Sequence, residues 1–345
     1  MDVERVLLAR PRGFCAGVEM AIKALAWMCR VYEPPVYCYH EIVHNKVVVD
    51  HFVEMGVIFV DDVSEVPAGA PLMLSAHGSA PEVEATARIS DRVVVNAVCP
   101  LVTKVHHEMK VRANKGYTVL YVGHAGHEEA MGTMAVAPNA VRLVSSAADV
   151  DALGDLGPDV ALLTQTTLSQ AEAAEVRSRA VERFPELWMP GRSDLCFATT
   201  NRQAALSAIA DQVDAMVVVG SSNSSNTLAL EKVARAAGCP KVYRVNTAAE
   251  LPNDLSGIVG VTAGASAPEE LVDAVLQRLA PSGGVTEVNV TQEDEYFPPP
   301  RELRDLARVM ATAVGAALGG PPDTTPALAE DRLLSASDAL EALAH

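Results

Sequence analysis

The sequence predicts an α/β protein built from three similar modules, each with a mostly parallel sheet, arranged around a pseudo-threefold axis. Runs rich in Val, Ile and Leu alternate with helical stretches, which is typical of parallel strands covered on both faces. The same order of elements occurs three times, and a cysteine before a helical stretch opens each repeat. The expected ranges are 17–99, 100–196 and 197–292 with 1–16, followed by a C-terminal wrap and tail at 293–345.

Each repeat is expected to run strand, polar loop, helix, strand, short helix, strand, polar loop. The first strands and their loops lie at 34–45, 117–129 and 214–226, the second strands at 57–67, 141–153 and 242–252, and the third strands with their loops at 71–81, 160–169 and 258–268. Ligands of parallel α/β sheets bind beyond the carboxyl ends of the strands. We therefore expect the three sets of polar loops to line one central site. The alternative is three modules in a row with unrelated sites.

The three cysteines that open the repeats keep a common spacing to the polar loops. The separations are 29, 28 and 28 positions to the first loop and 62, 67 and 70 to the last; the pairs are Cys15 with His44 and His77, Cys99 with His127 and Thr166, and Cys196 with Ser224 and Ser266. Three thiols in register indicate a shared ligand, either an iron–sulfur cluster or zinc. The lack of any C-x-x-C pair disfavours structural zinc. For a single cysteine, packing as a small hydrophobe is the simpler explanation, and we expect it for Cys29, Cys38 and Cys239.

The loops are rich in hydrogen-bond donors that suit a small phosphorylated compound. Besides the residues in register, they contain Thr167, Ser225 and Asn226. The sequence has neither a GxxxxGK[ST] nor a GxGxxG motif, which disfavours nucleoside triphosphates and dinucleotides. In an extended loop, alternation would place Glu129 on the same side as His127 and Glu128 on the other. Glu129 is therefore the candidate proton donor, and His124 is a weaker candidate than His127.

Composition excludes several classes of protein. The 345 residues include 27 basic and 44 acidic ones, a formal net charge of −17, which argues against nucleic acids and anionic membranes as partners. The apolar stretch 309–320 is shorter than the roughly 20 residues that span a bilayer, and MDVERVLLARPRG is not a secretory signal. We expect a cytoplasmic protein whose end, 319–345, is partly disordered or forms a short helix.

Nine motifs together resemble one known family. They are PRGFCAG (11–17), EIVHN (41–45), SAHG (75–78), CPLVTKVH (99–106), GHAGHEE (123–129), TQTTLS (164–169), CFATTNRQ (196–203), NSSN (223–226) and TAGASAP (262–268). In this order, from about Val6 to about Arg304, the chain is similar to the 4-hydroxy-3-methylbut-2-enyl diphosphate reductases of the LytB (IspH) family. Two positions differ from that family's usual pattern. Glu128 stands where proline is common, and Ser222 stands where a basic residue is common.

The resemblance implies a cofactor and a set of site residues. A central [4Fe–4S] cluster with one open iron would be held by Cys15, Cys99 and Cys196. The catalytic residues would be Glu129 as proton donor, Thr166 beside the substrate hydroxyl, and His127. The substrate would be bound by His44, His77, His127, Thr166, Ser224, Ser225, Asn226 and Ser266.

The resemblance also implies a reaction and partners. The reaction would be a reductive dehydroxylation that yields isopentenyl and dimethylallyl diphosphates, the last step of the non-mevalonate pathway. Electrons would come from ferredoxin or flavodoxin, and we expect a monomer. Two alternatives stay open. One is a non-catalytic paralogue that binds a small phosphorylated ligand or senses through its cluster. The other is a zinc protein that uses the same cysteines.

Overall fold

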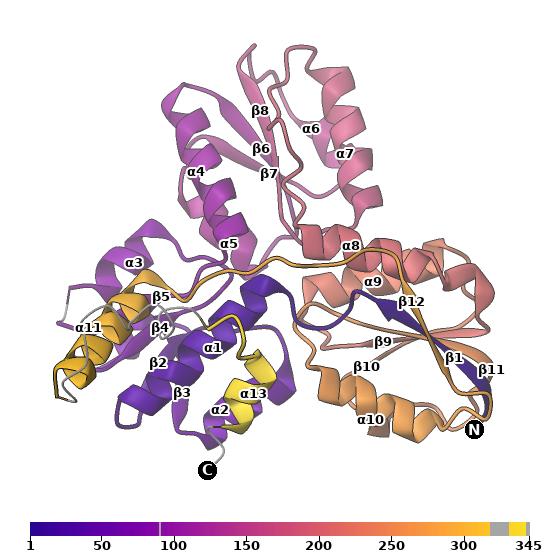
Figure 1. Ribbon diagram of the computed structural model, residues 1–345. Helices are drawn as coiled ribbons and strands as arrows, with labels where there is room; N and C mark the ends of the chain where they lie inside the picture. Colours follow the sequence, from indigo (N-terminus) through magenta and orange to yellow (C-terminus); the bar gives the residue numbers. More distant parts are fainter. Residues whose placement is uncertain (90, 318–330, 343–345) are drawn as a thin grey trace. The chain divides into compact units, whose positions relative to one another are not determined.

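The computed structural model describes residues 1–89, 91–317 and 331–342, which form two compact units. The first unit comprises 1–15, 44–46 and 101–293, and the second comprises, of the described residues, 16–43, 47–89, 91–100, 294–317 and 331–342. The described strands form three sheets of five, four and three strands, and all of their pairings are parallel. The α/β class with three parallel sheets is thereby confirmed (Figure 1).

The five-stranded sheet of the first unit has a hydrophobic core on each face, although its edge strand β12 is mostly exposed. Its strands, in spatial order, are β10 (Val242–Val245), β9 (Ala215–Val219), β11 (Ser256–Ala263), β1 (Asp2–Arg10) and β12 (Val285–Asn289). Alternate residues of β1 and β9 enter different cores, because successive side chains of a strand point to opposite faces. Helix α10 (Glu269–Leu279) covers one face, and α8 (Phe197–Ser207) and α9 (Ser225–Ala236) cover the other (Figure 1).

The three-stranded sheet of the same unit follows the same plan. Its order is β7 (Val141–Val144), β6 (Thr118–Val122) and β8 (Val160–Thr164). Helices α6 (Ala147–Ala152) and α7 (Gln170–Arg183) pack on one face, and α4 (Pro100–Asn114) and α5 (Glu128–Ala135) pack on the other. With both faces covered, the strands read as continuous apolar runs, as predicted.

The second unit contains the four-stranded sheet. Its order is β3 (Val57–Val60), β2 (Val36–Tyr39), β4 (Leu72–Leu74) and β5 (Val94–Asn96), accompanied by α1 (Ala16–Val31), α2 (Lys46–Glu54), η1 (Val63–Glu65) and α3 (Pro81–Ala87). In each of the three sheets, the first strand of the repeat lies between the second and the third. The short helix expected between the second and third strands is η1, α6 or η3 (Ala248–Glu250). The predicted order of elements is therefore confirmed.

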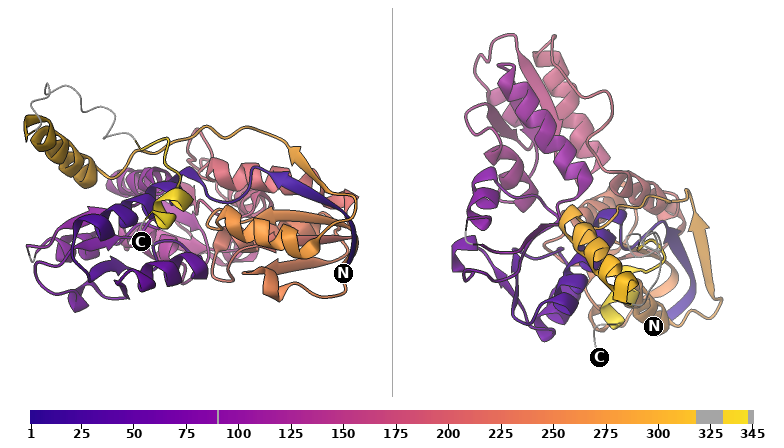
Figure 2. Two further views of the ribbon diagram at one scale, coloured as in Figure 1. Left: turned by 60° about the horizontal axis from the view of Figure 1, so that its bottom comes forward. Right: turned by 60° about the vertical axis from the view of Figure 1, so that its left-hand side comes forward.

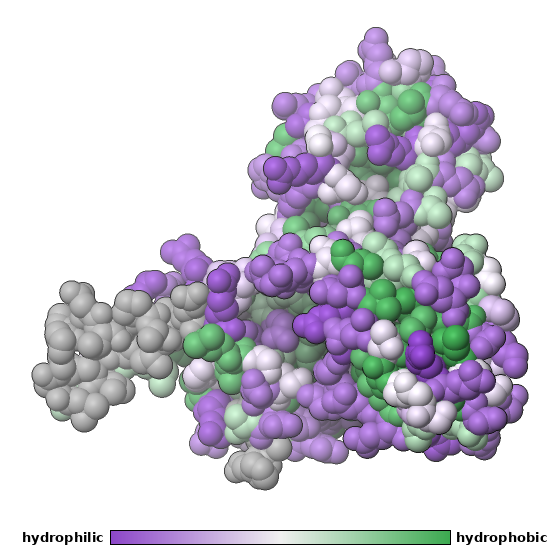
Figure 3. All heavy atoms as spheres, turned by 45° about the vertical axis from the view of Figure 1, so that its right-hand side comes forward, coloured by the Kyte–Doolittle hydropathy of each residue, from purple (hydrophilic) through white to green (hydrophobic). Residues whose placement is uncertain are grey.

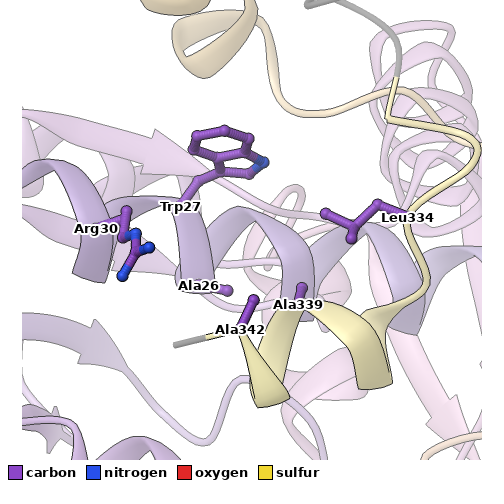
Figure 4. A pocket seen from close by; sticks show the side chains of 6 residues that line it. All are labelled: Ala26, Trp27, Arg30, Leu334, Ala339 and Ala342. Atoms are coloured by element: carbon purple, nitrogen blue, oxygen red, sulfur yellow. The ribbon is translucent and has the colours of Figure 1, made fainter. Parts of the chain in front are cut away.

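The chain ends on the second unit, where α11 (Arg301–Ala317) contacts β5 and α13 (Ala336–Glu341) lies along α1 (Figure 2). The buried Lys23 of α1 donates hydrogen bonds to the carbonyl oxygens of Asp331 and Leu334, at 3.2 and 3.0 Å. A small apolar pocket between α1 and this segment is lined by Ala26, Trp27, Arg30, Leu334, Ala339 and Ala342 (Figure 4). The expected short helix is thus present, whereas 319–330 and 343–345 lie outside the described residues.

Hydrophilic side chains predominate on the face drawn in Figure 3, and apolar ones occur there in smaller patches. Within the described ranges, no helix is both long enough and apolar enough to cross a membrane.

Candidate functional site

The loop after β6 differs from the extended loop that the sequence suggested. His127 is the N-cap of α5, and Glu128 and Glu129 form the first helical turn. The expectation that the side chains of residues 127–129 alternate as in an extended loop was therefore wrong, because these residues enter a helix. Helical geometry nevertheless separates the two carboxyl groups. Glu129 is buried at 2% exposure, whereas Glu128 is half-buried.

Glu129 is held by the residue two positions beyond the end of β8. The backbone N–H of Thr166 donates to Glu129 Oε1 at 2.7 Å, and the Thr166 hydroxyl donates to Oε2 at 3.0 Å. Burial raises the pKa of Glu129 to about 7, and the charge of Asp194 adds to the rise, although the Thr166 bonds and His44 oppose it. A carboxyl group with this pKa exchanges protons readily at neutral pH.

Two histidines adjoin this carboxyl group. His127 Nδ1 accepts a hydrogen bond from the backbone N–H of Glu129 at 3.2 Å, so that a neutral ring carries its proton on Nε2. The rings of His44 and His127 meet edge to face, with centroids 5.4 Å apart. His44 Nε2 lies 4.0 Å from Glu128 Oε2. The sequence places His44 and His127 far apart, and the fold brings them into contact.

Hydroxyl groups gather at the N-terminus of α9. Ser224 is the N-cap of this helix, and its Oγ accepts the N–H of Thr227. Ser266, in the loop after β11, donates its hydroxyl to the carbonyl oxygen of His44 at 2.9 Å and lies 3.5 Å from Ser224 Oγ. The Thr167 hydroxyl donates to Ser225 Oγ at 2.9 Å. A helix N-terminus with hydroxyl donors around it favours an anion.

Two of the three cysteines in register belong to the first unit. The N–H of Cys15 donates to the carbonyl oxygen of Ala265 at 3.2 Å. Cys196 is the N-cap of α8, and its Sγ accepts the N–H of Thr199 at 3.2 Å and lies 3.0 Å from the Thr199 hydroxyl. Burial raises the pKa of Cys196 to about 12, and the Cys15 thiol adds to this rise. A thiol such as that of Cys196, which ionises reluctantly without a nearby cation, suits a metal group that binds thiolates.

Residues 6–280 match the family described as LytB protein. The chain belongs to the LytB family. A 4-hydroxy-3-methylbut-2-enyl diphosphate reductase of Rhodopirellula baltica is 45% identical over 319 residues, which cover 91% of this chain and 100% of that protein.

Two solved structures of similar enzymes also match. The E-1-hydroxy-2-methyl-but-2-enyl-4-diphosphate reductase from Plasmodium falciparum matches with a TM-score of 0.85 and 31% identity, over 90% of this chain and 99% of that one. A second structure is described as (E)-4-hydroxy-3-methyl-but-2-enyl diphosphate reductase, the terminal enzyme of the non-mevalonate pathway. It matches with a TM-score of 0.58 and 28% identity, over 80% of this chain and 99% of that one.

The other LytB-motif residues lie in the second unit. His77 follows β4 in the SAHG motif and is half-buried. Cys99 follows β5, and its N–H donates to the carbonyl oxygen of Ala76 at 3.0 Å, which ties the cysteine to the loop that carries His77. Both residues follow strand ends, as predicted. None of the six cysteines, all of which lie in the described ranges, forms a disulfide; Cys29 lies in α1, Cys38 in β2, and Cys239 just after α9.

Two buried polar residues were not singled out from the sequence: Gln165, in the TQTTLS motif, and Asp194, which lies outside the nine motifs. Gln165, fully buried, accepts the N–H of His124 at 3.0 Å and donates to the hydroxyls of Thr167 and Ser225 at 3.0 and 3.3 Å. It thus joins the loops after β6 and β8 to α9. Asp194, also buried, accepts the N–H of Thr164 at 3.1 Å and faces Lys104 Nζ at 3.2 Å. A polar residue next to a buried strand was the available signal for Gln165.

Proposed function

We propose that this protein is a 4-hydroxy-3-methylbut-2-enyl diphosphate reductase that forms isopentenyl and dimethylallyl diphosphates in the last step of the non-mevalonate pathway. The single observation that carries this conclusion is the buried Glu129–Thr166 pair. It occurs in a chain that is 45% identical to an enzyme of that name over the full length of that enzyme. An allylic alcohol loses hydroxide with difficulty, so a proton must reach the departing oxygen. The reaction consumes two electrons and two protons and releases water.

We propose Glu129 as the group that delivers a proton. Its pKa of about 7 leaves a large fraction of the carboxyl group protonated at neutral pH. Thr166 fixes both oxygens of the carboxyl group, and burial keeps bulk water from competing for the proton. His127 orders the first turn of α5 through the Glu129 N–H, which supports a role for it beside the carboxyl group. Thr166 would also lie beside the substrate hydroxyl.

The diphosphate would be bound by imidazole, hydroxyl and amide donors. The proposed binding residues are His44, His77, His127, Thr166, Ser224, Ser225, Asn226 and Ser266. In the first unit, the contacts among His44, Ser224 and Ser266 and the N-terminus of the twelve-residue α9 support this assignment. These local donors explain how a chain with a net charge of −17 could bind an anion.

The thiolates of Cys15, Cys99 and Cys196 are the proposed ligands of a [4Fe–4S] cluster. Such a cluster supplies single electrons, a task that no side chain performs. The chain's own part is to hold the sulfur atoms and to donate hydrogen bonds to them, as Thr199 does for Cys196. A small carrier such as ferredoxin or flavodoxin is the proposed electron donor, and a single chain in the cytoplasm is the proposed working form.

We keep the module ranges 17–99, 100–196 and 197–292 with 1–16 as a proposal. Each parallel sheet falls within one of these ranges, and the pairing of β1 with β11 and β12 supports the assignment of 1–16 to the third.

Anaerobic turnover of the diphosphate with an artificial reductant tests the proposal. The parent should form both five-carbon products, and Glu129→Gln should lower the rate about 10²- to 10⁴-fold, which is the usual contribution of a positioned acid. Glu128→Gln is the matched control and should change the rate little. Full activity of Glu129→Gln would remove the carboxyl group from its proposed role.

A further inference from the structure

A fully buried arginine lies on the helix that Cys196 begins. Arg202 belongs to α8, six positions after Cys196, and its side chain has 0% exposure. Burial of a guanidinium is unfavourable unless protein groups replace its hydrogen bonds to water and an anion balances its charge. Nothing in the proposed proton transfer or in the proposed diphosphate binding uses this charge.

Arg202 makes half of its six hydrogen bonds to the loop that carries Cys15. Nε and Nη2 donate to the carbonyl oxygen of Gly13 at 3.0 and 2.8 Å, and Nη2 also donates to that of Phe14 at 3.1 Å. Nη1 donates to the carbonyl oxygen of Ala198 at 3.1 Å and to both carboxylate oxygens of Glu293, at 3.0 and 3.1 Å. The planar fork of the guanidinium is fully used, and Glu293 balances its charge.

The opposite edge of the same loop is also held. The N–H groups of Gly13 and Cys15 donate to the carbonyl oxygens of Ala263 and Ala265, at 3.4 and 3.2 Å. Gly13 has a φ of +67°, and a Cβ there would lie 3.2 Å from the carbonyl oxygen of Ala267. A side chain at this position would be strained by the positive φ and would crowd that carbonyl oxygen, so the loop packs closely against the segment after β11, and Arg202 covers its other edge.

The segment after β11 leads back to Cys196. The N–H of Ala265 donates to Asn226 Oδ1 at 2.9 Å, and Asn226 Nδ2 donates to Thr199 Oγ1 at 3.3 Å. Thr199 in turn contacts Cys196 Sγ. The two cysteines are therefore linked by two routes, one through Arg202 and one through Asn226.

We propose that Arg202 is a positioning residue that fixes the Cys15 loop to the start of α8, and so sets how two of the three sulfur ligands face each other. The proposal rests on the proposed function for the identity of the bound group. The hydrogen bonds of Arg202 to Gly13 and Phe14, here called the clamp, are present in the chain without any metal. Lysine could keep the charge but not the contacts, because one ammonium group cannot reach three carbonyl oxygens and Glu293 in these directions.

Hydrogen exchange of the metal-free protein tests the clamp directly. In Arg202→Lys, the amides of Gly13 and Cys15, which donate to Ala263 and Ala265, should exchange at least tenfold faster than in the parent, because the loop opens without the guanidinium contacts. The matched control is Arg183→Met, which removes an arginine that donates to the carbonyl oxygens of Asp151, Leu153 and Gly154. It should affect exchange near 151–154 and leave the Gly13 and Cys15 amides unchanged. Unchanged exchange of the Gly13 and Cys15 amides in a folded Arg202→Lys protein would overturn the proposal.

Metal retention supplies a second readout. After anaerobic reconstitution, iron should be lost in air at least fivefold faster from Arg202→Lys than from Arg183→Met, with Arg202→Met at least as fast as Arg202→Lys. Equal rates of iron loss from Arg202→Lys and Arg183→Met would show that Arg202 contributes only to general stability, and would overturn the positioning role. A parent protein that takes up no iron would refute the proposed function, while the exchange result would still decide the clamp.

Discussion

Removal of the Glu129 charge should make the stability of the metal-free protein less dependent on pH. The pKa of this carboxyl group is raised by burial from an ordinary 4.5 to about 7 in the folded chain. Below pH 4.5 the group is protonated in both the folded and the unfolded states. Between pH 4.5 and 7 the carboxyl group is mostly ionised in the unfolded chain, whereas in the folded chain it is still mostly protonated. The stabilising contribution is therefore complete at low pH and is lost as the pH rises through the folded pKa.

The magnitude follows from the size of the shift. Each pH unit between the two pKa values lowers the free energy of unfolding by about 1.4 kcal/mol. From pH 5.5 to 8 the parent should lose about 2 kcal/mol that Glu129→Gln retains. Glutamine keeps an oxygen for the Thr166 N–H, and its amide can donate to the Thr166 hydroxyl, which can also accept. The substitution therefore removes the charge with little other cost.

Calorimetry of the two metal-free proteins across this pH range measures the effect. The Tm of the parent relative to that of Glu129→Gln should fall on the order of 4 °C from pH 5.5 to 8. Glu175→Gln, at an exposed position of α7, is the control and should follow the parent. Parallel Tm profiles for the parent and Glu129→Gln would show that the carboxyl group keeps an ordinary pKa, and would refute the argument from burial.

Three further predictions concern other contacts. Thr166→Ala removes the hydroxyl donor to Glu129 Oε2, so the pKa of Glu129 should rise further, and the decline of kcat at alkaline pH should shift upward; an unchanged pH profile would contradict this. Lys23→Met leaves the half-buried Asp331 carboxylate without its cation and should lower the free energy of unfolding by about 3–5 kcal/mol. The control is Arg179→Met, which removes an exposed ion pair. Lys23→Met should be cleaved at 331–342 faster than this control, and equal rates of cleavage would contradict the prediction. Serine at Cys15, Cys99 or Cys196 should abolish iron retention, whereas serine at Cys29, Cys38 or Cys239 should preserve it.

Much of the fold could be predicted from local sequence. Strands such as 215–219 are buried on both faces, so their apolar runs are continuous and easy to recognise. The three repeats keep a similar spacing because each is built from the same succession of strands and helices. The loop at 127–129 was harder, because the N-cap role of His127 depends on where α5 begins, and histidine is not a common N-cap residue.

The candidate site was predicted in part. The candidate site residues stand out in the sequence, since His, Ser and Cys at strand ends are polar groups in unusual places. Arg202, Gln165 and Asp194 were not predicted because they act through partners distant in the chain. The Arg202–Gly13 contact joins residues 189 positions apart, and no local pattern reveals such a pair.

Analysis of one anaerobic sample tests the central claim most directly. Iron, acid-labile sulfide and zinc should be measured in the purified protein, and the diphosphate and a reductant should then be added to the same sample. The protein should be brown, contain about four iron and four sulfide per chain, and then form isopentenyl and dimethylallyl diphosphates. Colourless protein with stoichiometric zinc and no conversion of the diphosphate would contradict the claim.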